Sequence, residues 1–101
     1  MYNINMKFEW DADKNSSNKM KHEIDFEAAK GLWLDEDRVE IRVPYPIEDR
    51  WIVIGKLQKK VWSAIYTIRA ESVRLISVRR ARKKEVELYE NKEKSYKQRR
   101  A

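Results

Sequence analysis

The sequence predicts an α+β fold, in which two N-terminal helices and a C-terminal helix pack on a small antiparallel sheet. Apolar and polar residues alternate over several short segments in the middle of the chain, as they do in strands. Aspartates precede two segments with helical spacing, and a highly charged stretch without Gly or Pro closes the chain. At 101 residues the chain is long enough for one domain, residues 1–101. We expect its ends, 1–6 and 98–101, to be flexible.

The N-terminal third predicts one strand and two helices. Residues 7–10 form a short strand candidate, and Asp11 after it is a suitable N-cap for a helix over 12–21. Asp25 is a second N-cap, for a helix that ends near Leu34. In that second segment one helix face carries Phe26, Ala29 and Trp33, at i, i+3 and i+7.

The middle of the chain predicts a meander of three to four strands, to which the N-terminal strand is added. The segments are 39–43, 50–57, 61–69 and 73–79, joined by short connections that favour antiparallel neighbours. In the last segment, strict alternation places Val73, Leu75, Ser77 and Arg79 on one face. A helix over 80–97 follows, and one side of it carries Val86, Tyr89 and Tyr96.

Positive charge is concentrated at the C-terminal end. The formal net charge is +6, and residues 74–101 contain 11 Lys or Arg against 4 Asp or Glu. Five of the six residues from Arg79 to Lys84 are basic. Such a block binds phosphates or an acidic protein, although a solvated helix face has the same composition.

Composition also narrows the class of protein. Cysteine is absent, which excludes disulfides and thiolate sites and fits the reducing cytoplasm. No apolar run is long enough for a membrane span, so we expect no membrane partner. The chain has no glycine-rich phosphate loop and no metal-binding motif, and we therefore expect neither a metal nor a nucleotide cofactor.

Several residues are candidates for chemistry. His22 is the one histidine and follows Lys21 at a predicted helix end, where it either transfers protons or is a surface histidine favoured by the helix dipole. Arg69 and Arg79 end successive strands and either form a phosphate-binding cleft or pair with local carboxylates such as Glu71 or Glu85. Tyr89 faces either the sheet or a cleft.

The order of these residues resembles the BrnT family, the toxins of bacterial type II toxin–antitoxin pairs. The resemblance covers residues 8–89, and its specificity lies in the order and spacing of motifs that are individually weak. The matching landmarks are Phe8-Glu9-Trp10-Asp11, Lys14, Asn18, Lys21-His22, Phe26-Glu27-Ala28-Ala29, Arg50, Ile54-Gly55, Tyr66-Thr67, Arg69, Arg74, Ile76-Ser77, Arg79, Ala81, Glu85 and Tyr89.

The resemblance implies a RelE-like fold and a metal-independent ribonuclease that arrests translation in the cytoplasm. It implies RNA as substrate and a cognate antitoxin that resembles ribbon–helix–helix proteins, BrnA in that family. The complex represses its own operon, so operator DNA is contacted only through the antitoxin. This chain departs from the family at Glu23, where Gly is common, which leaves open the turn geometry beside His22.

If the resemblance holds, His22 transfers a proton during RNA cleavage, assisted by Lys21. Arg69 and Arg79 clamp the phosphate, and Tyr89 stacks on a base or donates a proton. The remaining basic residues serve RNA capture or antitoxin docking: Arg80, Arg82, Lys83 and Lys84. The alternative function is a basic RNA- or protein-binding module without turnover. A DNA-binding protein is disfavoured, because no helix-turn-helix pattern is evident.

Overall fold

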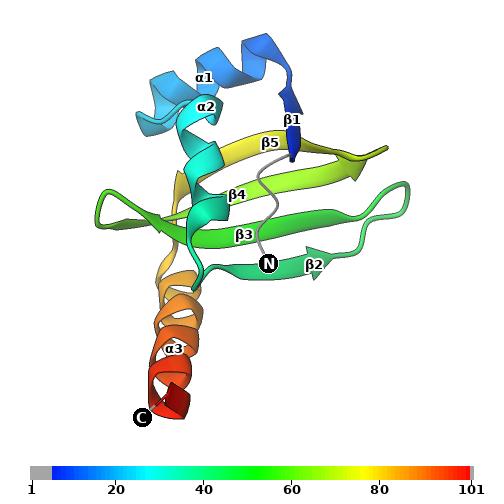
Figure 1. Ribbon diagram of the computed structural model, residues 1–101. Coiled ribbons are helices and arrows are strands. Elements are labelled where there is room, and N and C mark those ends of the chain that lie inside the picture. Colours follow the sequence, from blue (N-terminus) through cyan, green and yellow to red (C-terminus); the bar gives the residue numbers. More distant parts are fainter. Residues whose placement is uncertain (1–5, 101) are drawn as a thin grey trace.

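A computed structural model describes residues 6–100, with side chains described for 6–92, and shows an α+β fold (Figure 1). A five-stranded sheet is accompanied by helices α1 and α2, a 3₁₀ helix η1 and a C-terminal helix α3. The elements are β1 Lys7–Trp10, α1 Ala12–His22, α2 Phe26–Ala29, η1 Lys30–Leu34, β2 Val39–Val43, β3 Arg50–Leu57, β4 Lys60–Arg69, β5 Ser72–Arg80 and α3 Lys83–Arg100.

The sheet has the strand order β1-β5-β4-β3-β2, and its last four strands form the predicted antiparallel meander. The expectation of a wholly antiparallel sheet is wrong, because β1 pairs in parallel with β5. The sheet is therefore mixed. β1 is added at the edge opposite β2, and local residue patterns encode neither this position nor the direction of the strand.

The first helix is as predicted, with the Asp11 carboxylate accepting a hydrogen bond from the Asp13 N–H. The second segment is not one regular helix. Asp25 caps a single α-turn, α2, which tightens into η1. Gly31 lies in this tighter part, and it lowers the helix propensity there. A Cβ at this glycine would lie 2.7 Å from the Leu57 side chain, so its absence allows the close approach to β3.

The core lies between the sheet and the α1–α2–η1 segment. Trp33, 1% exposed, is packed edge-on between Phe8 and Tyr66, with ring centroids 5.1 and 5.2 Å away. The other buried members of this cluster are Ile24, Phe26, Ala29, Leu32, Val53, Ala64, Val73, Leu75 and Val78. Three of the aromatic and aliphatic landmarks, Phe26, Ala29 and Tyr66, belong to this cluster, and Phe8 and Trp10 pack against it.

A β-bulge in β5 changes which of its residues face the core. Tyr66 pairs with Leu75, but the preceding Ile65 pairs with Ser77, so that Ile76 is an extra residue. Val78 therefore joins Leu75 in the core, and Ser77 turns to the opposite face of the sheet together with Arg79. The strict alternation expected for residues 73–79 is wrong beyond Leu75 for this reason.

Helix α3 starts at Lys83, later than predicted, and runs past the β2 edge of the sheet (Figure 1). Val86 is half-buried and Tyr89 is buried, as their spacing predicts, whereas the side chain of Tyr96 lies outside those described. Most of the ends predicted to be flexible, 1–6 and 98–101, also lie outside the described side chains. Within the described residues, no helix has the length and hydropathy needed to cross a membrane.

Asn18 fastens α1 to the edge of β5, beyond the last residue that pairs with β1. Its side chain is 5% exposed, accepts the N–H of Val78 and donates to the carbonyl of Ile24, each at 2.9 Å. One side chain thus satisfies an edge amide of the sheet and the turn that follows α1.

Replacing Asn18 by Ala is expected to lower the free energy of unfolding by about 2 kcal/mol, since two buried backbone groups lose their partner. Urea unfolding followed by circular dichroism measures this change. Ser16→Ala, at an exposed position of the same helix, is the matched control. Equal stability of the two variants would show that Asn18 does not hold α1 to the sheet.

Candidate functional site

A depression of about 390 Å³ lies between α1 and the bulged part of β5. It brings together charged and hydroxyl side chains from the helix with two residues of the strand. The lining residues are Asp13, Lys14, Ser17, Asn18, Lys21, His22, Ile76 and Ser77. Both members of the predicted Lys21-His22 pair therefore lie in one concave surface.

Helical spacing explains why these side chains gather. Lys14, Ser17, Asn18 and Lys21 fall at i, i+3, i+4 and i+7, which is one side of α1. Asn18 holds this side against β5, so the two lysines lie along the mouth of the depression. His22 is the last residue of the helix and is exposed. The site thus combines an imidazole with two solvent-accessible ammonium groups.

Glu23 adopts the left-handed conformation that ends α1, with φ 62° and ψ 24°. Its N–H donates to the carbonyl of Lys19 at 2.9 Å. Glu23 thus ends the helix in a conformation that favours Gly, at a cost on the order of 1 kcal/mol for a residue with a Cβ. The change to Glu adds a negative charge beside His22 without removing the turn.

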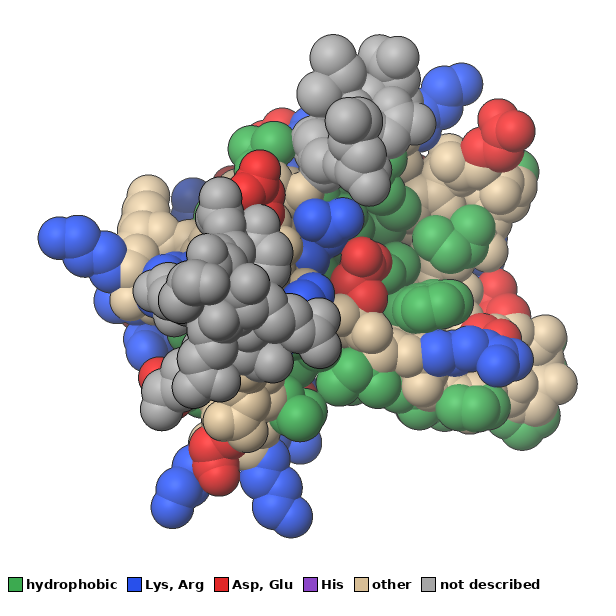
Figure 2. All heavy atoms as spheres, turned by 60° about the horizontal axis from the view of Figure 1, so that its bottom comes forward, with side chains coloured by type: hydrophobic (Ala, Val, Ile, Leu, Met, Phe, Trp, Pro, Cys, Tyr) green, Lys and Arg blue, Asp and Glu red, His purple; other side chains and the backbone are tan. Residues whose placement is uncertain are grey.

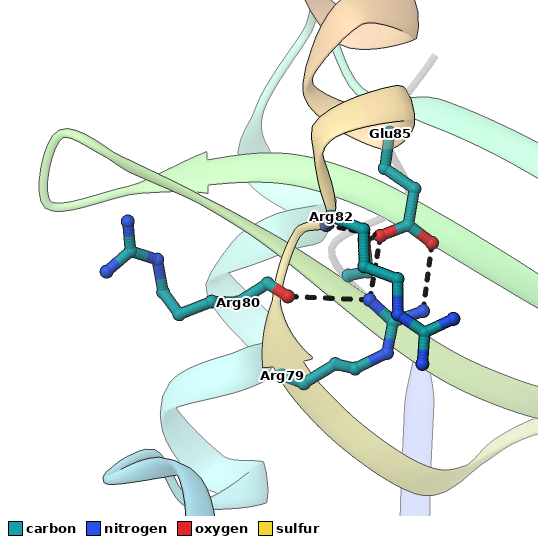
Figure 3. Close-up of polar contacts among 5 residues, drawn as sticks. Arg79, Arg80, Arg82 and Glu85 are labelled. Atoms are coloured by element: carbon teal, nitrogen blue, oxygen red, sulfur yellow. Dashed lines mark hydrogen bonds and ion pairs between the residues drawn. The ribbon is translucent and has the colours of Figure 1, made fainter.

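Arg79 points to Glu85 at the start of α3, and its two terminal nitrogens bind the two carboxylate oxygens at 2.7 and 2.9 Å (Figure 3). The Ser63 hydroxyl and the Arg82 N–H donate to the same carboxylate, at 2.9 and 2.8 Å. Hydrogen bonding from Arg79, above all, lowers the pKa of Glu85 to about 2, and the same bond raises the pKa of Arg79. Pairing with a local carboxylate, one of the two predicted alternatives, is thus what the structure shows for Arg79.

Arg69 lies at the other end of the sheet from Arg79. Arg69 pairs with Ser72 and Arg79 pairs with Ser63, so the arginines are about 20 Å apart along β4. The expectation that both clamp one phosphate is wrong, since consecutive antiparallel strands place their C-terminal residues at opposite ends. The Arg69 guanidinium is 3.5 Å from the carboxylate of Glu48.

Tyr89 is also not among the residues that line the depression. Its hydroxyl donates to Asp35 at 2.7 Å, and the Lys56 ammonium lies 5.7 Å from the centre of its ring. The same Asp35 oxygen accepts the N–H of Lys56 at 2.8 Å. Tyr89 thus joins α3 to β3 and to the segment before β2. Tyr89 also borders a second depression, of about 590 Å³, with Asp35 and Lys56, so it packs on the sheet and at the same time lines a cleft separate from the one beside His22.

The basic block around the start of α3 is solvent-exposed, with the Arg80 guanidinium over the ring of Trp62 at 5.5 Å. The other exposed members are Arg82, Lys83 and Lys84. In Figure 2, several Lys and Arg side chains project at the margins, and others lie near the centre among hydrophobic and acidic side chains. This face therefore presents separate cationic projections rather than one continuous basic patch.

The depression contains residues that the sequence did not single out as site residues. Lys14, Ser17 and Asp13 follow from the spacing on α1, which was readable once Lys21 was a candidate. Ser77 was not predictable in this role, because only the bulge at Ile76 places it there. Among the described residues, no group of three or more His, Asp or Glu side chains is arranged to hold a metal ion.

Comparison with known families supports the resemblance. The family model described as "Ribonuclease toxin, BrnT, of type II toxin-antitoxin system" matches residues 10–85. That range includes α1, the whole sheet beyond β1 and the Arg79–Glu85 pair. No curated protein matched the chain. Because the matched range spans most of the sequence, the chain belongs to the BrnT family of ribonuclease toxins of type II toxin–antitoxin systems.

Proposed function

We propose that this chain is an endoribonuclease that cleaves RNA without a metal ion and thereby inhibits translation in the cytoplasm. The observation that carries the proposal is the depression that His22, Lys14 and Lys21 line together. An imidazole transfers protons near neutral pH, and ammonium groups attract the phosphate backbone. These are the groups that cleavage by an internal nucleophile requires.

In this mechanism the 2′-hydroxyl of the RNA attacks the adjacent phosphorus, and the bond to the 5′-oxygen of the next nucleotide breaks. His22 accepts the proton of the attacking 2′-hydroxyl, and the leaving 5′-oxygen takes up a proton from water. Lys21 and Lys14 lie beside it and stabilise the added negative charge on the phosphate. Arg79 lies two residues from Ser77 on the same face of β5. Because its guanidinium is paired with Glu85, we assign it a structural role at the edge of the depression rather than contact with the reacting phosphate.

The proposed partners are RNA and a cognate antitoxin. We propose that the chain has a RelE-like fold and is neutralised by a BrnA-like antitoxin of the ribbon–helix–helix type. The complex would repress its operon, with operator DNA contacted by the antitoxin. The exposed cations Arg80, Arg82, Lys83 and Lys84 are proposed to capture RNA or to contact the antitoxin, in keeping with their position outside the depression.

Incubation of the purified protein with a single-stranded RNA in excess EDTA tests the enzymatic proposal. Cleavage is expected to continue at a rate within about twofold of that without chelator, with products ending in a cyclic phosphate or 3′-phosphate, because the 2′-hydroxyl is the nucleophile. Mass spectrometry of the products identifies these ends. Loss of cleavage in EDTA that Mg²⁺ restores would exclude the metal-independent mechanism. RNA binding without cleavage in either condition would favour the non-enzymatic module.

A further inference from the structure

A row of isoleucines crosses the face of the sheet opposite to the core. The register joins Ile41 of β2 to Ile52 of β3, Ile52 to Ile65 of β4, and Ile65 to Ser77 of β5. Directly paired residues of antiparallel strands point to the same face, so these four side chains form one line. We call Ile41, Ile52 and Ile65 the isoleucine row.

This row is less covered than its neighbours. Val53 and Ala64, on the core face, are 0% exposed, and so is Ile54 in the adjacent line beside α3. The three isoleucines of the row each keep part of their surface accessible, although two of them lie in central strands. An apolar surface of this kind is stabilised when a partner covers it.

The row leads into the candidate site. Ser77, which pairs with Ile65 and continues the line into β5, lines the depression with His22 and Lys21, while Ile41 lies about 14 Å away across three strand spacings. A segment that covers the isoleucine row from the β2 edge therefore reaches the depression without leaving the sheet face.

Charge indicates which kind of partner fits. Two carboxylates of this face are engaged, since Glu9 binds Arg74 at 2.8 Å and Glu85 binds Arg79. At the Ser77 end, the exposed Lys14 and Lys21 outnumber Asp13, the one carboxylate that lines the depression. A second copy of this chain would bring a further net charge of +6 against these cations, and a phosphate backbone gains little from isoleucine side chains.

We propose that the isoleucine row is the docking surface for an apolar segment of the antitoxin with acidic residues at one end, which neutralises the toxin by covering the His22 depression. This inference rests on the proposed function for the existence of an antitoxin. The apolar part of the segment lies on Ile41 and Ile52, and its carboxylates face Lys14 and Lys21. The segment would therefore block access to the depression and also offset its positive charge.

The test uses Ile41→Asp and Ile52→Asp in the full chain, with the product of the neighbouring reading frame as the antitoxin probe. Ile47→Asp is the matched control, because Ile47 is 97% exposed in the loop between β2 and β3. Each row variant is expected to weaken antitoxin binding on the order of 30-fold or more, since a charge would enter a desolvated contact. Ile47→Asp is expected to bind within about twofold of the wild type. Calorimetry measures affinity, and circular dichroism verifies folding.

Cleavage of RNA by the same variants without antitoxin separates docking from catalysis. It is expected to stay at the wild-type rate, because Ile41 and Ile52 do not line the depression. Wild-type antitoxin affinity of both folded row variants, or no binding of the probe by the wild type, would overturn the docking proposal whatever the cleavage result. Loss of RNA cleavage with unchanged antitoxin binding would assign the row to RNA. A wild-type dimer that dissociates in Ile52→Asp, with antitoxin affinity unchanged, would assign it to a second copy.

Discussion

Replacement of His22 by Ala is expected to reduce the rate of RNA cleavage by about 10²- to 10⁴-fold, the usual contribution of a positioned proton-transfer group. The residue is exposed at the end of α1, so the loss should not be accompanied by unfolding. Single-turnover cleavage of a labelled RNA measures the rate, and thermal unfolding measures the stability of the variant. Met20→Ala, at a position of the same helix that is 86% exposed, is the control.

Variants of the lysines and arginines locate the rest of the site. Lys21→Ala is expected to reduce cleavage and Lys21→Arg to retain most of it, because the proposed role of Lys21 is positive charge. Arg69→Ala is expected to leave cleavage nearly unchanged, since Arg69 does not line the depression and lies at the other end of β4 from the residue that pairs with Arg79. If the folded His22→Ala variant cleaved RNA at the wild-type rate, the depression would not be the active site. A large loss of cleavage in Arg69→Ala would instead place the active site near the β4–β5 turn.

Replacement of Glu85 by Ala is expected to lower the free energy of unfolding by about 3 kcal/mol at neutral pH. The side chain is 15% exposed and accepts hydrogen bonds from Arg79, Ser63 and the backbone of Arg82, so its removal leaves a mostly buried guanidinium without its carboxylate. Urea unfolding at pH 7 measures the change. Glu87→Ala, at an exposed position of the same helix, is the control.

The pH dependence of this effect has a defined sign. The pKa of Glu85 falls from 4.5 to about 2 in the folded protein, chiefly through the hydrogen bond from Arg79. A lowered carboxyl pKa stabilises the folded state above pH 4.5 and loses this contribution as the pH falls toward 2. The difference in unfolding free energy between wild type and Glu85→Gln should therefore be smaller at pH 3 than at pH 7.

A double-mutant cycle tests the pairing itself. The cost of Arg79→Ala and Glu85→Ala together is expected to be less than the sum of the two single costs, because each single variant leaves the other charge unpaired. Additive costs, or a Glu85→Ala variant as stable as Glu87→Ala, would contradict the role of this pair in attaching α3 to the sheet.

Local signals predicted much of the fold. The strands at residues 7–10 and 50–57 have the predicted bounds, and both aspartate N-caps are present. These features depend on neighbours within a few residues, which is why periodicity and capping residues reveal them. The family is likewise evident from the order of motifs along the chain.

The candidate site was only partly predictable. The Lys21-His22 pair was recognised, and its place in a depression agrees with the proposed role. Tyr89 and Arg69 were grouped with it because sequence order does not give distance between elements. Glu85 was predicted as a family landmark and as an alternative partner for Arg79 but not as a site residue, although it accepts hydrogen bonds from three residues.

The sequence by itself determined the strand segments, the first helix, the two caps, the basic C-terminal end and the BrnT family pattern, because each of these is encoded by residue type and spacing. Only the tertiary structure decided the parallel pairing of β1, the bulge at Ile76 and the separation of Arg69 from Arg79. These depend on how non-adjacent strands register with one another. A shift of one residue reverses the face of every later side chain, and that shift places Ser77 where the isoleucine row meets His22 and Lys21.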